Sequence, residues 1–245
     1  MGSEMCIRDR YEFIYGLFFM PSLQYVDVPS TQAHTATVIW LHGLGDSGNG
    51  FAPIVPELKL PADSGIRFIF PHAPERPVTI NNGMRMRAWY DITTMDFNHR
   101  ADRTGVEESA TQVAELIEGE IAAGISPNRI VLAGFSQGGV IALHMAARSP
   151  HTLAGVMALS TYMCEPQKLS SEMNSNNIST PIFMGHGSLD EVVPLALGKN
   201  ACEALKQQDF NVSFNTYAMQ HSVCFEELQD IRAYLIEALN INESV

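Results

Sequence analysis

Six short apolar runs, separated by segments with helical periodicity, constrain the fold of this chain more than any other feature. The runs are mostly continuous rather than alternating, which is typical of parallel strands buried on both faces. We expect strands at residues 36–41, 66–70, 129–133, 155–159, 181–184 and 211–217, and helices at residues 51–60, 106–123, 139–148, 195–208 and 223–239. This alternation predicts an α/β fold with an open, mostly parallel sheet and helices on both faces. Active sites on such sheets lie beyond the carboxyl ends of the strands.

Size, charge and cysteine usage narrow the classes of function. The chain has 245 residues, enough to bury a core without disulfides or a metal. Its 15 Lys and Arg against 27 Asp and Glu give a net charge of −12, which repels phosphate backbones, so we expect no nucleic-acid partner. The four cysteines lie far apart without a C-x-x-C pair, so neither a zinc site nor a disulfide framework is indicated. We therefore expect a reducing compartment, the cytoplasm.

The N-terminal residues do not continue the pattern of the rest. Residues 1–19 combine a charged decapeptide with an apolar stub, and we interpret them as an atypical extension or as a short helix packed on the body. Residues 20–245 are expected to form a single domain. The apolar run 13–20 is too short to span a bilayer, which takes roughly 20 residues, so we expect no stable membrane anchor. Instead it is expected to pack on the protein's own surface or on a second copy, which leaves a homodimer possible.

A glycine-rich loop follows the first expected strand. Residues 42–48 (HGLGDSG) contain G-x-G-x-x-G between a strand and a helix, the setting of a dinucleotide-binding fingerprint. Such a site needs an acid at the end of the next strand to bind the ribose. Here that strand is followed by Pro71 and His72, and the nearest acid, Asp63, precedes it. The sequence therefore disfavours a nucleotide cofactor, and we expect none.

A second glycine motif surrounds Ser136. Residues 134–138 (GFSQG) match G-x-S-x-G directly after an expected strand and directly before an expected helix. In that setting a sharp turn presents the serine hydroxyl at the edge of the sheet. The flanking glycines allow neighbouring backbone to approach so tight a turn. The motif predicts that Ser136 is a nucleophile, with a plain glycine turn as the alternative.

A serine nucleophile needs a base and an acid, which follow it in the order acid and then histidine. Asp190 follows the expected strand 181–184, and His221 follows the expected strand 211–217. Both therefore lie where the fold would bring them to Ser136. Glu191 is the rival acid, and Asp190 could instead cap a helix. Two other histidines also follow strands but precede Asp190 in the chain: His72 and His186.

Attack on a carbonyl also requires two N–H groups for the resulting oxyanion. One comes from the residue after the nucleophile, here Gln137. The other comes from the loop after an earlier strand, and the sequence around Leu44 resembles the H-G-G-G loop of esterases. Leu44 and Gln137 are therefore the expected oxyanion donors.

Several blocks together resemble the small carboxylesterase and acyl-protein thioesterase family of α/β hydrolases. They are LHGLGDSG (41–48), FPHAP (70–74), MRAWYD (86–91), GFSQGG (134–139), HGSLDEVVP (186–194) and HSV (221–223). The resemblance covers about residues 23–240 and does not extend to residues 1–19. It implies an α/β-hydrolase fold without a large lid domain or a cofactor, with the triad Ser136, Asp190 and His221 and the oxyanion donors Leu44 and Gln137.

The resemblance also implies two substrate classes, small-molecule carboxylic esters and fatty-acyl thioesters on protein cysteines. A serine hydrolase that forms an acyl-enzyme is the expected activity, with an acyl-protein thioesterase as the alternative within the same chemistry. From other classes, a non-catalytic binding module on this fold and a dinucleotide-dependent enzyme are the remaining alternatives.

Two further segments allow both a functional and a structural interpretation. Met86, Trp89 and Tyr90 could form an apolar substrate wall, or they could belong to the core. Asp96, His99 and Asp102 form an acid–histidine cluster without the spacing of a known metal motif, so we expect a solvated loop and no metal.

Overall fold

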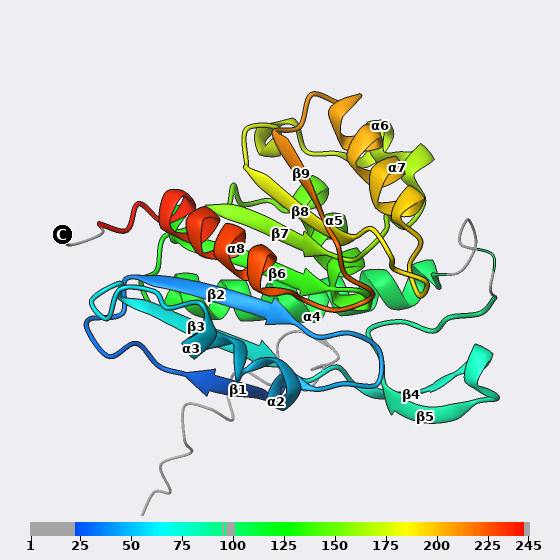
Figure 1. Ribbon diagram of the computed structural model, residues 1–245, viewed down its shortest axis with the longest axis horizontal. Helices are drawn as coiled ribbons and strands as arrows, with labels where there is room; N and C mark the ends of the chain where they lie inside the picture. Colours follow the sequence, from blue (N-terminus) through cyan, green and yellow to red (C-terminus); the bar gives the residue numbers. More distant parts are fainter. Residues whose placement is uncertain (1–22, 95, 97–100, 243–245) are drawn as a thin grey trace, which may run out of the picture.

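The computed structural model describes residues 23–94, 96 and 101–242. The expected extension at 1–19, its apolar run 13–20 and His99 lie outside the described residues. The elements form a seven-stranded sheet in the order β1-β3-β2-β6-β7-β8-β9, with helices on both faces (Figure 1). The strands are β1 (Tyr25–Val28), β2 (Ala36–Leu41), β3 (Ile66–Pro71), β6 (Ile130–Phe135), β7 (Gly155–Leu159), β8 (Ile182–Gly187) and β9 (Val212–Tyr217).

The sheet is parallel except at one edge. The pairs β2–β3, β2–β6, β6–β7, β7–β8 and β8–β9 are parallel, and β1 alone pairs antiparallel with β3 among these strands. A separate hairpin is formed by β4 (Glu75–Val78) and β5 (Met84–Arg87). This arrangement confirms the predicted α/β class, and the described part of the chain contains no large lid domain.

The continuous apolar runs are explained by two cores, one on each face of the sheet. In β2, Val38 and Trp40 point into one core, whereas Ile39 and Leu41 point into the other, and every residue of the strand is buried. Helices α4 (Arg103–Ala122), α5 (Gln137–Arg148) and α7 (Leu195–Lys206) contribute to the core that contains Ile39. Helix α8 (Phe225–Ala238) contributes to the core that contains Trp40. A strand covered on both faces cannot alternate apolar and polar residues, because neither face meets water.

Four of the five predicted helices correspond to α-helices of the structure, the one near residue 51 does not, and a short helix at Leu169–Glu172 is not among the predicted ones. The α-helices are α2 (Gly48–Phe51), α3 (Ile54–Glu57), α4 (Arg103–Ala122), α5 (Gln137–Arg148), α6 (Leu169–Glu172), α7 (Leu195–Lys206) and α8 (Phe225–Ala238). The prediction of a single helix at 51–60 is wrong, because the two short helices α2 and α3 lie in this region. Pro53 is the N-cap of α3 and Pro56 lies inside it, and proline provides no N–H for the continuous hydrogen bonding of a longer helix.

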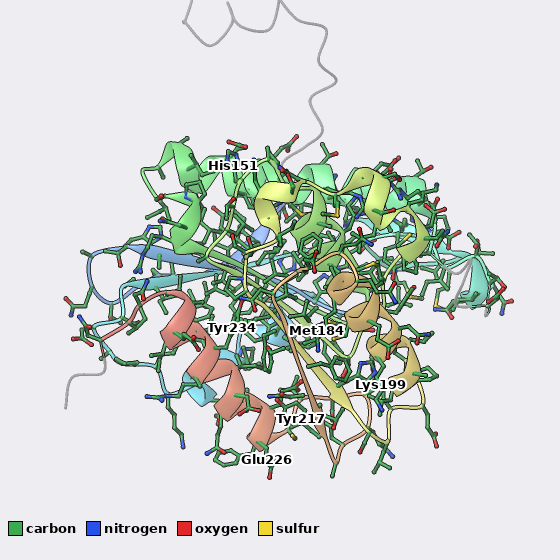
Figure 2. All side chains as sticks on the ribbon, turned by 90° about the horizontal axis from the view of Figure 1, so that it is seen from above. His151, Met184, Lys199, Tyr217, Glu226 and Tyr234 are labelled. Carbon is green, nitrogen blue, oxygen red and sulfur yellow. The ribbon has the colours of Figure 1, made fainter. Side chains whose placement is uncertain are left out.

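Figure 2 views the side chains from above, with Tyr234 on the side of α8 that faces the sheet and Glu226 at the start of that helix. The Tyr234 hydroxyl donates a hydrogen bond to the Pro181 carbonyl over 2.8 Å, which fastens α8 to β8. None of the described helices combines the length and the apolar character needed to cross a membrane.

Candidate active site

Ser136 occupies a sharp turn between β6 and α5. Its backbone φ of 53° and ψ of −115° are unusual for a residue other than glycine, and such conformations cluster at active sites. The turn is tight enough to require its glycines. A Cβ on Gly134 would lie 2.2 Å from the Gly138 carbonyl oxygen, and one on Gly138 would lie 2.5 Å from the Leu41 carbonyl oxygen. The predicted elbow is therefore present.

Asp190, His221 and Ser136 form one continuous hydrogen-bonded chain. The His221 Nδ1 lies 2.7 Å from the Asp190 Oδ2, and the His221 Nε2 lies 2.9 Å from the Ser136 Oγ. These residues come from loops that follow β8, β9 and β6, which end at the same edge of the parallel sheet. The structure thus brings together the three side chains predicted from chain order.

The Asp190 carboxylate is held on its second oxygen as well. Its Oδ1 accepts hydrogen bonds from the backbone N–H groups of Val192 and Val193, at 2.9 and 2.8 Å. Asp190 is buried, whereas its neighbour Glu191 is exposed. Asp190 is therefore the acid in contact with His221, whereas the rival acid Glu191 is exposed to solvent.

His72 and His186, the two histidines expected to follow strands ahead of Asp190, have different partners, and His186 lies inside β8 rather than after it. The buried His186 ring has its Nε2 2.8 Å from the Val193 carbonyl oxygen, and burial lowers the pKa of His186. Its Nε2 is also 3.7 Å from the Asp190 Oδ2, so this neutral ring lies beside the acid without replacing His221. The His72 Nδ1 accepts a hydrogen bond from the Gly48 N–H over 3.1 Å.

The loop that carries Leu44 is fixed from two sides. The buried His42 ring lies 2.7 Å from the Gly43 carbonyl oxygen through Nδ1, and its Nε2 accepts from the Ala73 N–H over 3.0 Å. The Gly45 N–H donates to the Arg87 carbonyl over 2.9 Å, which ties the loop to β5. The sequence marks His42 only as part of a glycine motif. Its position directly after a buried strand was the signal for a structural role here.

The Gln137 side chain connects the elbow to the segment that contains Trp89. Its Oε1 accepts from the Trp89 N–H over 2.8 Å, and its Nε2 donates to the Tyr90 carbonyl over 2.7 Å. The Trp89 indole N–H in turn donates to the His42 carbonyl over 2.8 Å. The side chains of Gln137 and Trp89 therefore link the loop at Leu44 to the start of α5. We call this arrangement the oxyanion clamp, formed by Gln137, Trp89 and His42.

The aromatic residues proposed as a substrate wall lie in the core. Trp89 and Tyr90 are 0% and 1% exposed, so the core interpretation of these two residues is the one that the structure supports. Met86 is partly buried, and its sulfur would be 3.8 Å from a Cβ placed on Gly45. Met86 thus borders the loop of Leu44, and its role in substrate binding stays a prediction.

The acid–histidine segment near residue 100 has a structural explanation on its described side. Asp102 is the N-cap of α4, and its Oδ2 accepts from the Gly105 N–H over 3.1 Å. Asp96 is exposed. Over the described ranges, no group of three or more His, Cys, Asp or Glu side chains is placed to hold a metal ion. Cys224 stands at the N-cap of α8, and burial raises the pKa of its thiol.

Comparison with known proteins agrees with this arrangement. Residues 25–239 match the family model described as Phospholipase/Carboxylesterase. Acyl-protein thioesterase 1 of Neurospora crassa is 42% identical over 221 residues, covering 86% of this chain and 90% of that protein. Acyl-protein thioesterase 1 of Cryptococcus neoformans is 39% identical, covering 89% of this chain and 98% of that protein.

Solved structures of similar proteins have the same fold as this chain. The crystal structure of Zea mays acyl-protein thioesterase 2 superposes with a TM-score of 0.80 at 30% identity, covering 88% of this chain and 99% of that chain. The crystal structure of Arabidopsis thaliana SOBER1 superposes with a TM-score of 0.79 at 34% identity, covering 84% of this chain and 99% of that chain. The chain belongs to the phospholipase/carboxylesterase family of α/β hydrolases.

Proposed function

We propose that this chain hydrolyses acyl groups from protein cysteines, using Ser136 as nucleophile, His221 as general base and Asp190 as the residue that orients His221. The observation that carries the proposal is the unbroken chain of hydrogen bonds from Asp190 through His221 to Ser136, at 2.7 and 2.9 Å. A serine hydroxyl beside such a pair can attack a thioester or an ester carbonyl.

In the first half of the reaction the Ser136 Oγ attacks the acyl carbonyl while the His221 Nε2 takes its proton. The Asp190 carboxylate accepts the Nδ1–H of His221, and it stabilises the imidazolium that forms. Collapse of the tetrahedral intermediate breaks the bond to sulfur, or to oxygen in an ester. The His221 Nε2–H then protonates the departing group, which leaves the acyl group on Ser136.

In the second half a water molecule attacks the acyl-enzyme, with His221 again acting as base. The acid is released and the Ser136 hydroxyl is restored. In both halves the carbonyl oxygen becomes an oxyanion, and we assign its two donors to the backbone N–H groups of Leu44 and Gln137. Gln137 opens α5, and the first N–H groups of a helix have no acceptor within it. The oxyanion clamp supports this assignment, because it fixes the distance between the two donor segments.

The thioester on a protein is the favoured substrate because of the relatives. Two fungal proteins about 40% identical to this chain bear the name acyl-protein thioesterase 1. The family description also names carboxylesterases, so hydrolysis of small carboxylic esters is the second candidate. Both substrates use the same acyl-enzyme chemistry.

The test compares an S-octanoyl peptide thioester with p-nitrophenyl octanoate on the wild type and on Ser136→Ala. We expect the wild type to cleave both, and Ser136→Ala to lose several orders of magnitude in kcat on both. Ser213→Ala, at the start of β9 and away from the carboxyl ends of the strands, is the matched control and should keep wild-type rates. A wild type that cleaves the ester but not the thioester would leave only the carboxylesterase function.

A further inference from the structure

A cleft borders His221 on the side of α2 and α3. Its volume is about 320 Å³, and its walls include Phe51 and Ile54 from this side and Val223 from the loop after β9. Among the described residues, no Asp, Glu, Lys or Arg lines it. Nothing in the reaction described above uses this cleft.

Three of the side chains that line the cleft form a row of rings, from Phe51 through Phe135 to the imidazole of His221. The rings of Phe51 and Phe135 have their centroids 5.4 Å apart, and those of Phe135 and His221 are 4.8 Å apart. Phe51, Ile54, Phe135 and Val223 are only partly buried, so apolar surface remains exposed inside the cleft. A concave, uncharged, aromatic-lined surface binds apolar groups.

The position of His221 decides which part of a substrate reaches this cleft. The His221 Nε2 must protonate the departing thiol or alcohol, so the leaving group lies on the His221 side of the carbonyl carbon. The cleft has His221 in its wall. A group attached to the leaving atom therefore comes close to the cleft.

We propose that this cleft is a leaving-group subsite, which binds an apolar side chain next to the acylated cysteine of the substrate protein. This inference rests on the proposed function and adds a preference for the sequence around the cysteine.

The expected preference is set by partial burial of an aliphatic side chain. Burying one additional methylene-sized group in a hydrophobic pocket discriminates substrates by about 10- to 200-fold. Because the cleft is open to solvent on one side, we expect the low end of that range, about tenfold in kcat/KM.

The experiment uses two peptides with the same acyl group: acetyl-Leu-Cys(S-octanoyl)-Leu-amide and acetyl-Asn-Cys(S-octanoyl)-Asn-amide. Leu and Asn have similar shapes and differ in polarity, and both substrates form the same octanoyl-enzyme. A leaving-group subsite therefore changes kcat/KM, which reports acylation, and leaves the deacylation step common to both. We expect the Leu peptide to have the larger kcat/KM, by about tenfold.

Three variants test whether the preference for the Leu peptide depends on the cleft. Ile54→Thr and Val223→Thr make its walls polar, and each should reduce the Leu/Asn ratio to about threefold or less. Val55→Thr is the matched control, because Val55 lies on the same short helix but lines a different cavity, between α3 and β3. It should keep the wild-type ratio.

Each contrary outcome has a separate meaning. Equal kcat/KM for both peptides in the wild type, or a ratio that falls equally in Val55→Thr, would refute the subsite. The Ile54→Thr and Val223→Thr variants could instead change the ratio of kcat/KM between octanoyl and butyryl peptides and leave the Leu/Asn ratio unchanged. That result would show that the cleft holds the acyl chain, and it would also refute the leaving-group subsite. Absence of turnover on both peptides, without labelling of Ser136 by a fluorophosphonate, would instead refute the proposed function.

Discussion

The buried carboxyl group of Glu227 is the basis for predicting a stabilising substitution. It lies in the first turn of α8 and is fully buried, and neither carboxyl oxygen has a hydrogen-bond partner among the described residues. Burial raises the pKa of Glu227 to about 8, and the nearby Asp230 adds to the effect. We therefore expect Glu227→Gln, which matches the shape of the protonated acid, to stabilise the protein at alkaline pH.

The direction of the pH effect on stability follows from the number of protons that the folded and unfolded states bind. The unfolded carboxyl ionises near 4.5, whereas the folded one stays protonated up to about 8. Between these pH values the unfolded state releases a proton that the folded state keeps, so the free energy of unfolding falls as the pH rises. The two pKa values, 4.5 and about 8, differ by about 3.5, and one pKa unit corresponds to about 1.4 kcal/mol. The loss from Glu227 therefore reaches about 5 kcal/mol above pH 8 at most.

The assay is urea unfolding of wild type and Glu227→Gln at pH 5 and pH 9. We expect the difference in free energy of unfolding to be below about 1 kcal/mol at pH 5 and to grow to several kcal/mol in favour of the variant at pH 9. Glu226→Gln is the control, because Glu226 is exposed in the same helical turn and should give no comparable gain. A difference that is the same at both pH values would refute the reasoning.

Four further perturbations test the site. Asp190→Asn should lower kcat by about 10⁴ in steady-state assays, because the His221 tautomer is no longer held; a loss below tenfold would contradict it. Gln137→Met keeps the backbone N–H but removes both side-chain hydrogen bonds of Gln137, and should lower kcat/KM by about 10- to 100-fold, whereas unchanged kinetics would exclude a catalytic role for the oxyanion clamp. Gly138→Ala should lower the melting temperature, because its Cβ would lie 2.5 Å from the Leu41 carbonyl oxygen; calorimetry giving a wild-type value would contradict this. Treatment with EDTA should leave turnover unchanged, and a loss restored by zinc would indicate a metal after all.

The strands of the central sheet could be predicted where apolar runs are bounded by turns. The expected runs 36–41 and 155–159 coincide with β2 and β7. The strand predicted at 181–184 was too short, because β8 continues through Gly185, His186 and Gly187. Those residues have the composition of a loop, but all three pair with β9, and Gly185 also pairs with β7, which keeps them extended. The edge strand β1 and the hairpin β4–β5 were missed, since exposed strands lack a continuous apolar run.

The three hydrogen-bonded side chains of Ser136, His221 and Asp190 could be predicted from the sequence better than the groups around them. Chain order and strand ends were enough to select Ser136, Asp190 and His221, because the fold forces these loops to one edge of the sheet. The clamp was not predictable, since it depends on a hydrogen bond between Gln137 and Trp89, 48 positions apart. The segment around Trp89 contains glycine and methionine, which is compatible with a substrate wall. Tertiary packing instead buries the Trp89 ring.

Peptide mapping of the fluorophosphonate adduct tests the central claim most directly. A fluorophosphonate reacts preferentially with a serine that is activated by a neighbouring base, so we expect a single adduct on Ser136 and its absence in His221→Gln. An adduct on Cys224 or on another serine, or unreduced labelling in His221→Gln, would contradict the assignment of Ser136 as the nucleophile activated by His221.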